Sequence, residues 1–202
     1  MLMREYQKQI QPWLDANRPF TAAEIRAAGI PSQVLVELHQ NGMIERLSRG
    51  VYLSTHAEIT ENLSLQVAAL KFPAGVFCLL SALRFHDFTT QLPQEIYLAV
   101  KAHCWIPRNV SPEMRFYPMT EASFFYGIEE HEIDGVKIRV YSAAKTVADC
   151  FKYRNKIGQD TALEALRDGC RRKLFSVTEL MSAAKVCRVT KIITPYLESI
   201  FS

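Results

Sequence analysis

Two short helices with a break of about three residues between them, followed by a tight hairpin, constrain this chain more than any other feature. The first helix is predicted over residues 20–29, where Thr21 and Glu24 have the spacing of a capping box. Gly29 can adopt the left-handed conformation that ends a helix, and Pro31 fits the first turn of the next one. This spacing is that of a helix-turn-helix.

The second predicted helix runs from Pro31 to Asn41-Gly42 and has two different faces. At about 100° per residue, Leu35 and Leu38 share one apolar face. The opposite face carries amides, a carboxylate and a small apolar group, which are side chains that can read base edges in a major groove. The predicted base contacts are Gln33, Val36, Glu37 and Gln40. An ordinary surface helix with mixed polar residues is the alternative.

A small hairpin with arginines near its tip follows directly. MIERL and VYL are short strand-like runs, and Gly50 between them can take a positive φ where the chain reverses. A purely structural hairpin has little use for two arginines there, whereas a hairpin beside DNA would place them on phosphates. The predicted phosphate contacts are Ser32, Arg46, Ser48 and Arg49. Tyr52 is expected to brace the hairpin rather than to touch DNA.

A helix upstream completes the N-terminal domain. Ile10, Trp13 and Leu14 keep helical spacing, with Pro12 as a kink. Three helices and a β-hairpin make a winged helix-turn-helix, a fold that binds nucleic acid in most proteins and docks other proteins in some. We assign residues 1–55 to this domain and residues 56–202 to a second one.

The second domain is predicted to be mixed, so the whole chain is α+β. An amphipathic helix is expected over residues 56–73 and a buried helix over 75–88. Strands follow in QEIYLAV and MRFYPM, and a hairpin turns at Asp134-Gly135, so the small sheet is expected to be mostly antiparallel. Four helices are predicted to form a helical end, over residues 143–154, 160–172, 177–186 and 192–200.

Positive charge is concentrated in this helical end. Residues 1–60 carry six basic and six acidic side chains, whereas residues 141–202 carry eleven and six. Such cations are compatible with a polyanionic partner, and equally with a role in complementing helix dipoles. Because the helix-turn-helix is neutral, they are candidates for an additional contact with DNA or a partner protein. The candidates are Lys145, Arg167, Arg171, Arg172, Lys173, Lys185 and Arg188.

The sequence lacks the common catalytic and metal-binding patterns. It has no E-x-K, D-x-D, G-x-S-x-G or P-loop, and its nearest carboxylate pair, Glu130 and Glu132, can be explained as a solvated strand face. Lys145 and Asp149 have the i, i+4 spacing of a helix salt bridge. The five cysteines form no C-x-x-C pair, which favours buried free thiols in a reducing cytosol. We therefore expect no enzyme activity, no metal and no cofactor.

Two segments of the chain resemble AbiEi-type antitoxins of type IV toxin–antitoxin pairs. The family's hairpin pattern, G-x-(I/L)-x-R-L-x-R-G-x-Y, is matched from Gly42 to Tyr52. The segment Ile133–Phe151 resembles the family's C-terminal region, where a D-G hairpin leads into a helix marked by a basic residue, Thr, an apolar pair and Asp. Here that run is Lys145 to Asp149. The resemblance covers roughly residues 20 to 170.

The resemblance implies a repressor that binds double-stranded DNA at the promoter of its own toxin–antitoxin operon. It further implies that the protein neutralises a nucleotidyltransferase-like toxin, with or without direct contact. The alternative is a protein-interaction module whose winged helix docks a partner. Without a signal peptide or a long apolar segment, the sequence indicates a cytoplasmic protein with no membrane partner. Monomer and dimer both stay open.

Overall fold

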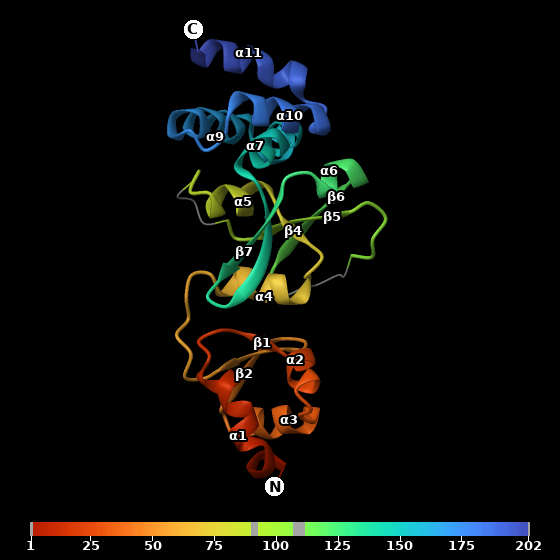
Figure 1. Cartoon of the computed structure of the whole chain (residues 1–202), viewed down its shortest axis with the longest axis vertical. Helices are drawn as coiled ribbons and strands as arrows, with labels where there is room; N and C mark the ends of the chain where they lie inside the picture. Colours follow the sequence, from red (N-terminus) through yellow and green to blue (C-terminus); the bar gives the residue numbers. More distant parts are fainter. Residues whose placement is uncertain (1, 90–92, 107–111, 202) are drawn as a thin grey trace. The chain divides into compact units, whose positions relative to one another are not determined.

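The computed structural model describes residues 2–89, 93–106 and 112–201. Within these residues, eleven helices and eight strands make a mixed α/β structure with two sheets (Figure 1). The chain forms two compact units. The first contains the described residues up to Pro73 together with Pro112 and His131–Ile138, and the second contains the others.

The N-terminal part of the first unit packs three helices against a small antiparallel sheet with the strand order β1-β3-β2. Its elements are α1 (Leu2–Asp15), β1 (Phe20–Thr21), α2 (Ala22–Ala27), α3 (Ser32–Gln40), β2 (Ile44–Ser48) and β3 (Val51–Ser54). The core takes residues from every helix, including Ile10, Ile25 and Leu38, none of which is exposed. Pro12 lies inside α1.

The predicted capping residues explain where α2 begins and ends. The Thr21 hydroxyl accepts a hydrogen bond of 3.1 Å from the Glu24 amide, which is one half of the expected capping box. The Glu24 carboxylate instead pairs with the Arg18 guanidinium at 3.3 Å. Gly29 takes a φ of 78°, the left-handed conformation predicted for the helix stop.

Helix α4 (Leu63–Lys71) follows in the first unit and is shorter than predicted. The chain between β3 and α4 makes turns instead, and its backbone amides bind partners outside a helical ladder. The Glu58 amide donates to Asn17 Oδ1, and the Leu63 amide donates to the Thr60 carbonyl. The expected helix over residues 56–73 was therefore wrong in its first turns.

The second sheet has the strand order β6-β5-β4-β8-β7. Its elements and those around it are β4 (Val76–Phe77), α5 (Leu79–Phe85), β5 (Ile96–Lys101), β6 (Met114–Met119), α6 (Glu121–Phe125), β7 (Ile128–Ile133) and β8 (Val136–Tyr141). The pairs β4–β8 and β5–β6 are parallel, and β4–β5 is antiparallel. The prediction of a mostly antiparallel sheet was wrong because parallel partners such as Phe77 and Val140 lie far apart in sequence, and no local turn signal reports them.

The apolar run over residues 75–88 contains a strand as well as a helix. Val76 and Phe77 form β4 in the middle of the sheet, and α5 begins directly after Cys78. Leu79 is fully buried at a φ of 47°, which marks the sharp change of direction. A continuous apolar run has no periodicity that separates a buried strand from a buried helix, so the predicted single helix was wrong in its first part.

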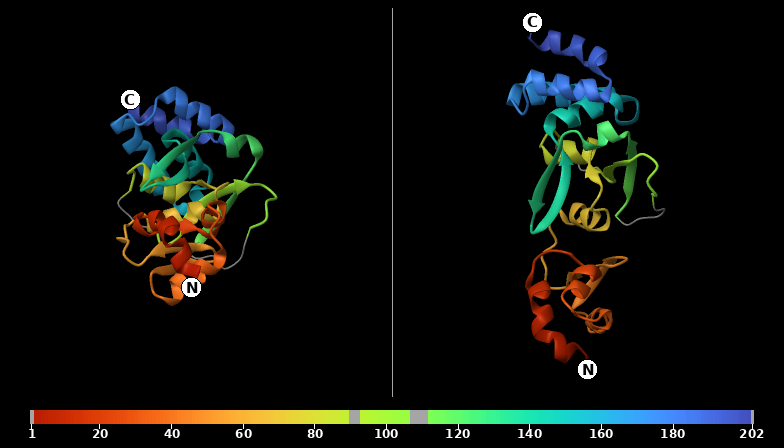
Figure 2. Two further views of the ribbon diagram at one scale, coloured as in Figure 1. Left: turned by 60° about the horizontal axis from the view of Figure 1, so that its bottom comes forward. Right: turned by 45° about the vertical axis from the view of Figure 1, so that its right-hand side comes forward.

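The hairpin of β7 and β8 turns where the sequence predicted. Asp134 and Gly135 have φ angles of 47° and 80°, the two positive values that a type I′ turn requires. The two strands form a long ribbon in both views of Figure 2. The strands predicted in QEIYLAV and MRFYPM are confirmed as β5 and β6.

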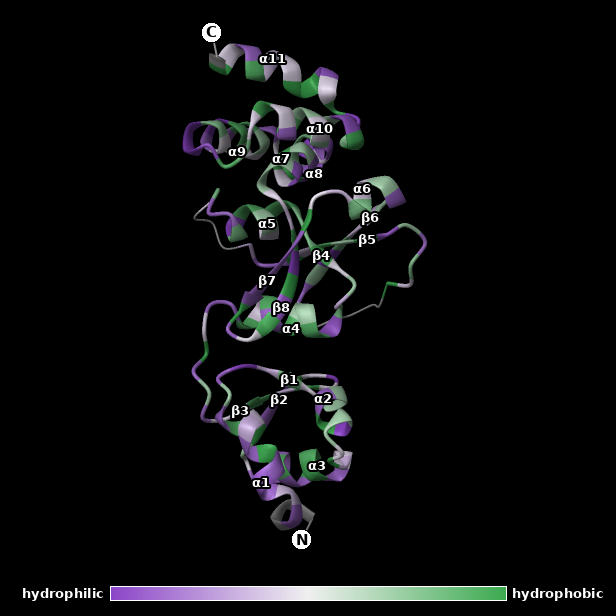
Figure 3. Cartoon of the chain, in the orientation of Figure 1, coloured by the Kyte–Doolittle hydropathy of each residue, from purple (hydrophilic) through white to green (hydrophobic). Residues whose placement is uncertain are grey.

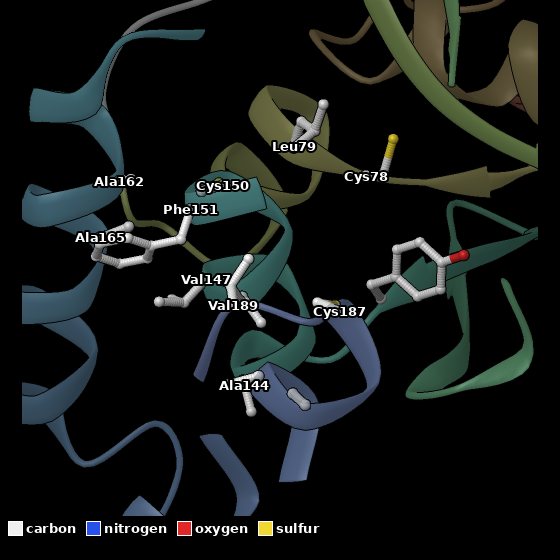
Figure 4. Close-up of a cluster of buried hydrophobic side chains, with 14 of the residues drawn as sticks. Cys78, Leu79, Ala144, Val147, Cys150, Phe151, Ala162, Ala165, Cys187 and Val189 are labelled. Carbon is white, nitrogen blue, oxygen red and sulfur yellow. The ribbon is translucent and has the colours of Figure 1, made fainter. Parts of the chain in front are cut away.

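The helical end surrounds one central helix, α7. Its elements are α7 (Ala143–Lys152), α8 (Arg154–Ile157), α9 (Gln159–Arg172), α10 (Val177–Cys187) and α11 (Thr190–Phe201). Ser142 caps α7, and Ser176 forms with Glu179 the predicted capping box of α10. Figure 4 shows Phe151 of α7 beside Ala162 and Ala165 of α9, in a core that contains no exposed residue.

Hydrophobic and hydrophilic residues are interspersed along the helices of both units (Figure 3). Across the described ranges, none of the helices is both long enough and apolar enough to cross a membrane.

Candidate nucleic-acid interface

Helix α3 is held against its own domain by one face only. Val34, Leu35 and Leu38 are buried in the N-terminal core. They are spaced one and three residues apart, so they occupy a single stripe of the helix. The break before α3 is fixed by the Ile30 amide, which donates to the Ile25 carbonyl at 3.1 Å.

The outer face of α3, which consists of Gln33, Val36, Glu37 and Gln40, points away from that core. Gln33 and Gln40 are exposed, and Glu37 is half-buried. Val36 is 56% exposed, although a valine on a helix that only covers a core is normally buried. The outer face therefore presents two amides, a carboxylate and an apolar group in neighbouring positions.

The first turn of α3 offers backbone donors as well. Pro31 occupies the N-cap position, and its side chain makes no capping hydrogen bond. The first amides of a helix have no partner within the helix, so such an end attracts anions. Ser32, the first residue of α3, is exposed beside these amides.

The hairpin β2–β3 carries two exposed arginines. Arg46 lies opposite Tyr52 on β3, and Arg49 lies in the turn with Gly50, whose φ is 78°. The Gly50 carbonyl accepts a hydrogen bond of 2.9 Å from the Ala22 amide, which anchors the turn to the start of α2. The ring of Tyr52 stacks on Phe20 with centroids 6.2 Å apart, an arrangement that fits its expected bracing role.

Ser48 lies differently from the other predicted phosphate contacts. Its hydroxyl oxygen is buried and makes no hydrogen bond with any described residue. The strand register shifts between Arg46 and Ser48, so the serine does not follow the exposed side of the hairpin. A phosphate contact from Ser48 would require its side chain to rotate, whereas Arg46 and Arg49 are exposed as they stand.

Lys145, one of the predicted additional contacts, lies inside the second unit and cannot reach DNA or a partner. Its ammonium is fully buried, 2.5 Å from Asp149 Oδ2 and 4.1 Å from the centre of the Tyr141 ring. Asp149 Oδ1 accepts a hydrogen bond of 3.2 Å from the Cys187 thiol. The buried pair therefore joins α7 to the end of α10, and the salt bridge predicted from the i, i+4 spacing is present but buried.

The groups around this pair are held in their neutral forms. Burial, with the charge of Asp149 as a smaller cause, raises the pKa of the Cys187 thiol to about 12. Burial also raises the pKa values of Cys78 and Cys150 well above the usual value of a thiol. The three thiols therefore stay protonated at neutral pH and contribute packing and one weak hydrogen bond.

The sequence did not reveal that this pair is buried. Lys145, Thr146, Asp149 and Lys152 fall on one side of α7, which is the pattern of a helix with a solvated polar face. In the structure every residue from Ala143 to Phe151 is nevertheless buried.

The other predicted cations of the helical end form two separate groups. Arg171 and Arg172 both bind Asp168, at 2.5 Å and 3.0 Å, and Arg172 also donates to the Asp87 carbonyl. Lys173 and Arg188 are the left-handed C-cap residues of α9 and α10. One group, Arg171, Arg172 and Lys173, lies at the end of α9, and the other, Lys185 and Arg188, lies at the end of α10, whose 11 residues span about 16 Å. The sequence cluster is therefore not one basic patch.

No group of three or more potential metal ligands occurs among the described residues. Glu130 and Glu132 both lie on β7 and are exposed. His103 and Cys104 are exposed in the loop after β5.

The arrangement of α1, α2 and α3 is consistent with a helix-turn-helix domain. Residues 8–55 match the family described as a transcriptional regulator, AbiEi antitoxin. The predicted resemblance is therefore confirmed for the segment that contains α3 and its hairpin. A search of curated proteins found no match. The second resembling segment, Ile133–Phe151, lies outside the matched residues.

Proposed function

We propose that this protein is a sequence-specific DNA-binding repressor with a winged helix-turn-helix. The observation that carries the proposal is the exposed outer face of α3 next to the arginine-bearing hairpin, within the segment that matches the antitoxin regulators. The outer face enters the major groove, where Gln33 and Gln40 read adenine, Val36 meets a thymine methyl and Glu37 accepts from cytosine.

Phosphate contacts position this helix on the duplex. Arg46 and Arg49 bind the backbone from the hairpin, and Ser32 binds it together with the first amides of α3. Ser48 adds a contact only if its hydroxyl turns outward. These contacts fix the register of the protein on DNA without carrying sequence information.

We further propose that the protein represses its own operon and acts as the antitoxin of a type IV pair. Its target is the nucleotidyltransferase-like toxin that the resemblance implies. The exposed cations Arg167, Lys173, Lys185 and Arg188 are assigned to the toxin's side, since they are split between two places and do not form a single track for a duplex. Co-expression with the adjacent toxin gene tests this role: rescue of growth is expected, and toxicity undiminished by the antitoxin would contradict it.

DNA binding is tested by fluorescence anisotropy on the duplex upstream of the gene and on a scrambled duplex of the same length. We expect the upstream duplex to bind about tenfold or more tightly, which corresponds to about 1.4 kcal/mol. Binding to both should weaken linearly with the logarithm of the salt concentration, with a slope of about −0.9 for each phosphate contacted.

The second candidate is a protein-docking module, and the exposed Val36 together with the neutral charge of residues 1–60 favours it. In that case neither duplex binds at low salt, and a captured protein partner is released only weakly by salt. Binding of the upstream duplex with a steep salt slope would rule out this candidate.

A further inference from the structure

Charge in the first unit is distributed unevenly in space although the helix-turn-helix is neutral in sequence. A cleft of about 730 Å³ begins at the turn of the β2–β3 hairpin and runs along α2, α4 and the tip of the β7–β8 hairpin, all within the first unit. Five cations and one carboxylate line this cleft. The cations are Arg18, Arg26, Arg49, Lys71 and Lys137.

The single carboxylate of the cleft already forms an ion pair. Glu24 pairs with Arg18 at 3.3 Å, and both side chains are partly exposed. Arg26, Arg49 and Lys137 are exposed and form no ion pair with any described residue. Exposed cations that exceed the carboxylates in a concave surface raise the local concentration of anions.

Specific contacts between side chains and the β7–β8 turn hold the walls of the cleft together. The Gln66 side chain of α4 donates to the Ile133 carbonyl and to Asp134 Oδ2, both at 3.3 Å. A Cβ added at Gly135 would lie 3.0 Å from Cδ of Arg18, so the arginine stem packs directly on the hairpin turn. The contacts of Gln66 and Arg18 hold α2, the β2–β3 turn and β8 around one opening. These three elements carry the exposed cations Arg26, Arg49 and Lys137.

We propose that this basic cleft is a second binding site for the phosphate backbone of double-stranded DNA, continuous with the hairpin turn through Arg49. This inference rests on the proposed DNA-binding function and extends its footprint to Arg26 and Lys137. A polymer is favoured over a small anion because the cations are spread along an open cleft rather than gathered around one point. Contacts of this kind strengthen binding to every duplex alike and do not discriminate between sequences.

The test removes the two exposed cations of the cleft that lie outside α3 and the β2–β3 hairpin. The variant Arg26→Ala/Lys137→Ala is compared with the intact protein on the upstream and the scrambled duplex at several salt concentrations. We expect both duplexes to bind several-fold more weakly at low salt. The salt slope should fall by about 1.8, since each lost phosphate contact contributes about 0.9. The ratio of the two affinities should not change.

A matched control removes two exposed cations elsewhere, Lys8→Ala/Lys191→Ala, and should leave the slope unchanged. Equal changes of the salt slope in the two variants would contradict the proposed site, because the change would then come from the net charge of the protein and not from the cleft. An unchanged slope in Arg26→Ala/Lys137→Ala, with the intact protein still binding, would also overturn it and would point to an acidic protein as the occupant. If the intact protein binds neither duplex, the proposed function itself fails. Circular dichroism melts check that both variants are folded.

Discussion

The helix-turn-helix and the helical end differ in what their cations contact. Residues 1–60 have as many acidic as basic side chains, yet Arg26, Arg46 and Arg49 are exposed and form no ion pair with a described residue. Residues 141–202 have five more basic than acidic side chains, yet Lys145 is buried on Asp149. The net charge of a segment therefore does not report how much of its charge a ligand can reach.

The two regions differ because a cation has different surroundings in each. In the helical end, two arginines share Asp168, and Lys173 and Arg188 lie at helix ends, where carbonyl groups favour positive charge. In the N-terminal domain, the arginines project from a hairpin and from the exposed side of α2. The comparison predicts that DNA affinity depends on the first region and stability on the second.

The largest expected effect is on stability, from Asp149→Ala. Removing one partner of a buried ion pair leaves the Lys145 ammonium without counter-charge, which typically costs about 3–5 kcal/mol. Urea unfolding should show a loss of that size. The double variant Lys145→Met/Asp149→Leu should recover most of it, because a well-packed apolar pair replaces both charges. A loss below about 1 kcal/mol in the single variant would show that the pair is not buried as described.

The next effect is on sequence selectivity, from Gln40→Ala on the outer face of α3. Loss of a bidentate contact to adenine should reduce the preference for the upstream duplex by about 1–3 kcal/mol. Competition binding against the scrambled duplex measures this preference. Gln7→Ala, which removes an exposed amide from α1, serves as the control and should leave it intact. A preference that survives Gln40→Ala would exclude that residue from base reading.

A smaller effect is expected on overall affinity, from Arg49→Ala in the hairpin turn. Both duplexes should weaken by about the same factor, and the salt slope should fall by about 0.9, because a single phosphate contact is lost. Arg49→Lys keeps the charge and should keep the slope. Unequal weakening of the two duplexes would show that Arg49 contacts a base rather than a phosphate.

The smallest effect is expected from Asp168→Asn, which releases Arg171 and Arg172. An exposed ion pair is worth roughly 0–1 kcal/mol, so the free energy of unfolding should change by no more than that. Burial alone would raise the pKa of Asp168, but hydrogen bonds from Arg172 and Arg171 lower it below its usual 3.8. Its contribution is therefore present above pH 3.8 and is lost as the pH falls through the lowered pKa. DNA affinity should not change, and a rise in this variant would show that Arg171 and Arg172, once released from Asp168, contact DNA.

Signals between neighbouring residues in the sequence predicted much of the fold and the exposed outer face of α3. The Thr21 cap, the Gly29 stop and the Asp134-Gly135 turn depend on neighbouring residues, and all three are found in the structure. The exposed and buried faces of α3 follow from helical periodicity alone, which is why the exposure of Val36 was readable from the sequence.

The features that the sequence did not predict depend on residues far apart along the chain. The parallel pairing of Phe77 with Val140 has no local signature. The basic cleft brings Arg26 and Lys137 to one opening across more than a hundred residues, so a count of charges by segment could not reveal it. The burial of the Ser48 hydroxyl has a related origin, because it accompanies a shift in strand register that the partner strand sets.

The measurement that tests the central claim most directly is the salt dependence of DNA binding for two double variants. Arg46→Ala/Arg49→Ala removes charge from the hairpin, and Arg167→Ala/Lys185→Ala removes the same charge from the helical end. We predict that the first variant lowers the log–log slope on the upstream duplex by about 1.8, through two lost phosphate contacts, and that the second leaves it unchanged. A lower slope in the second variant alone would contradict the account and would move the DNA contact to the helical end.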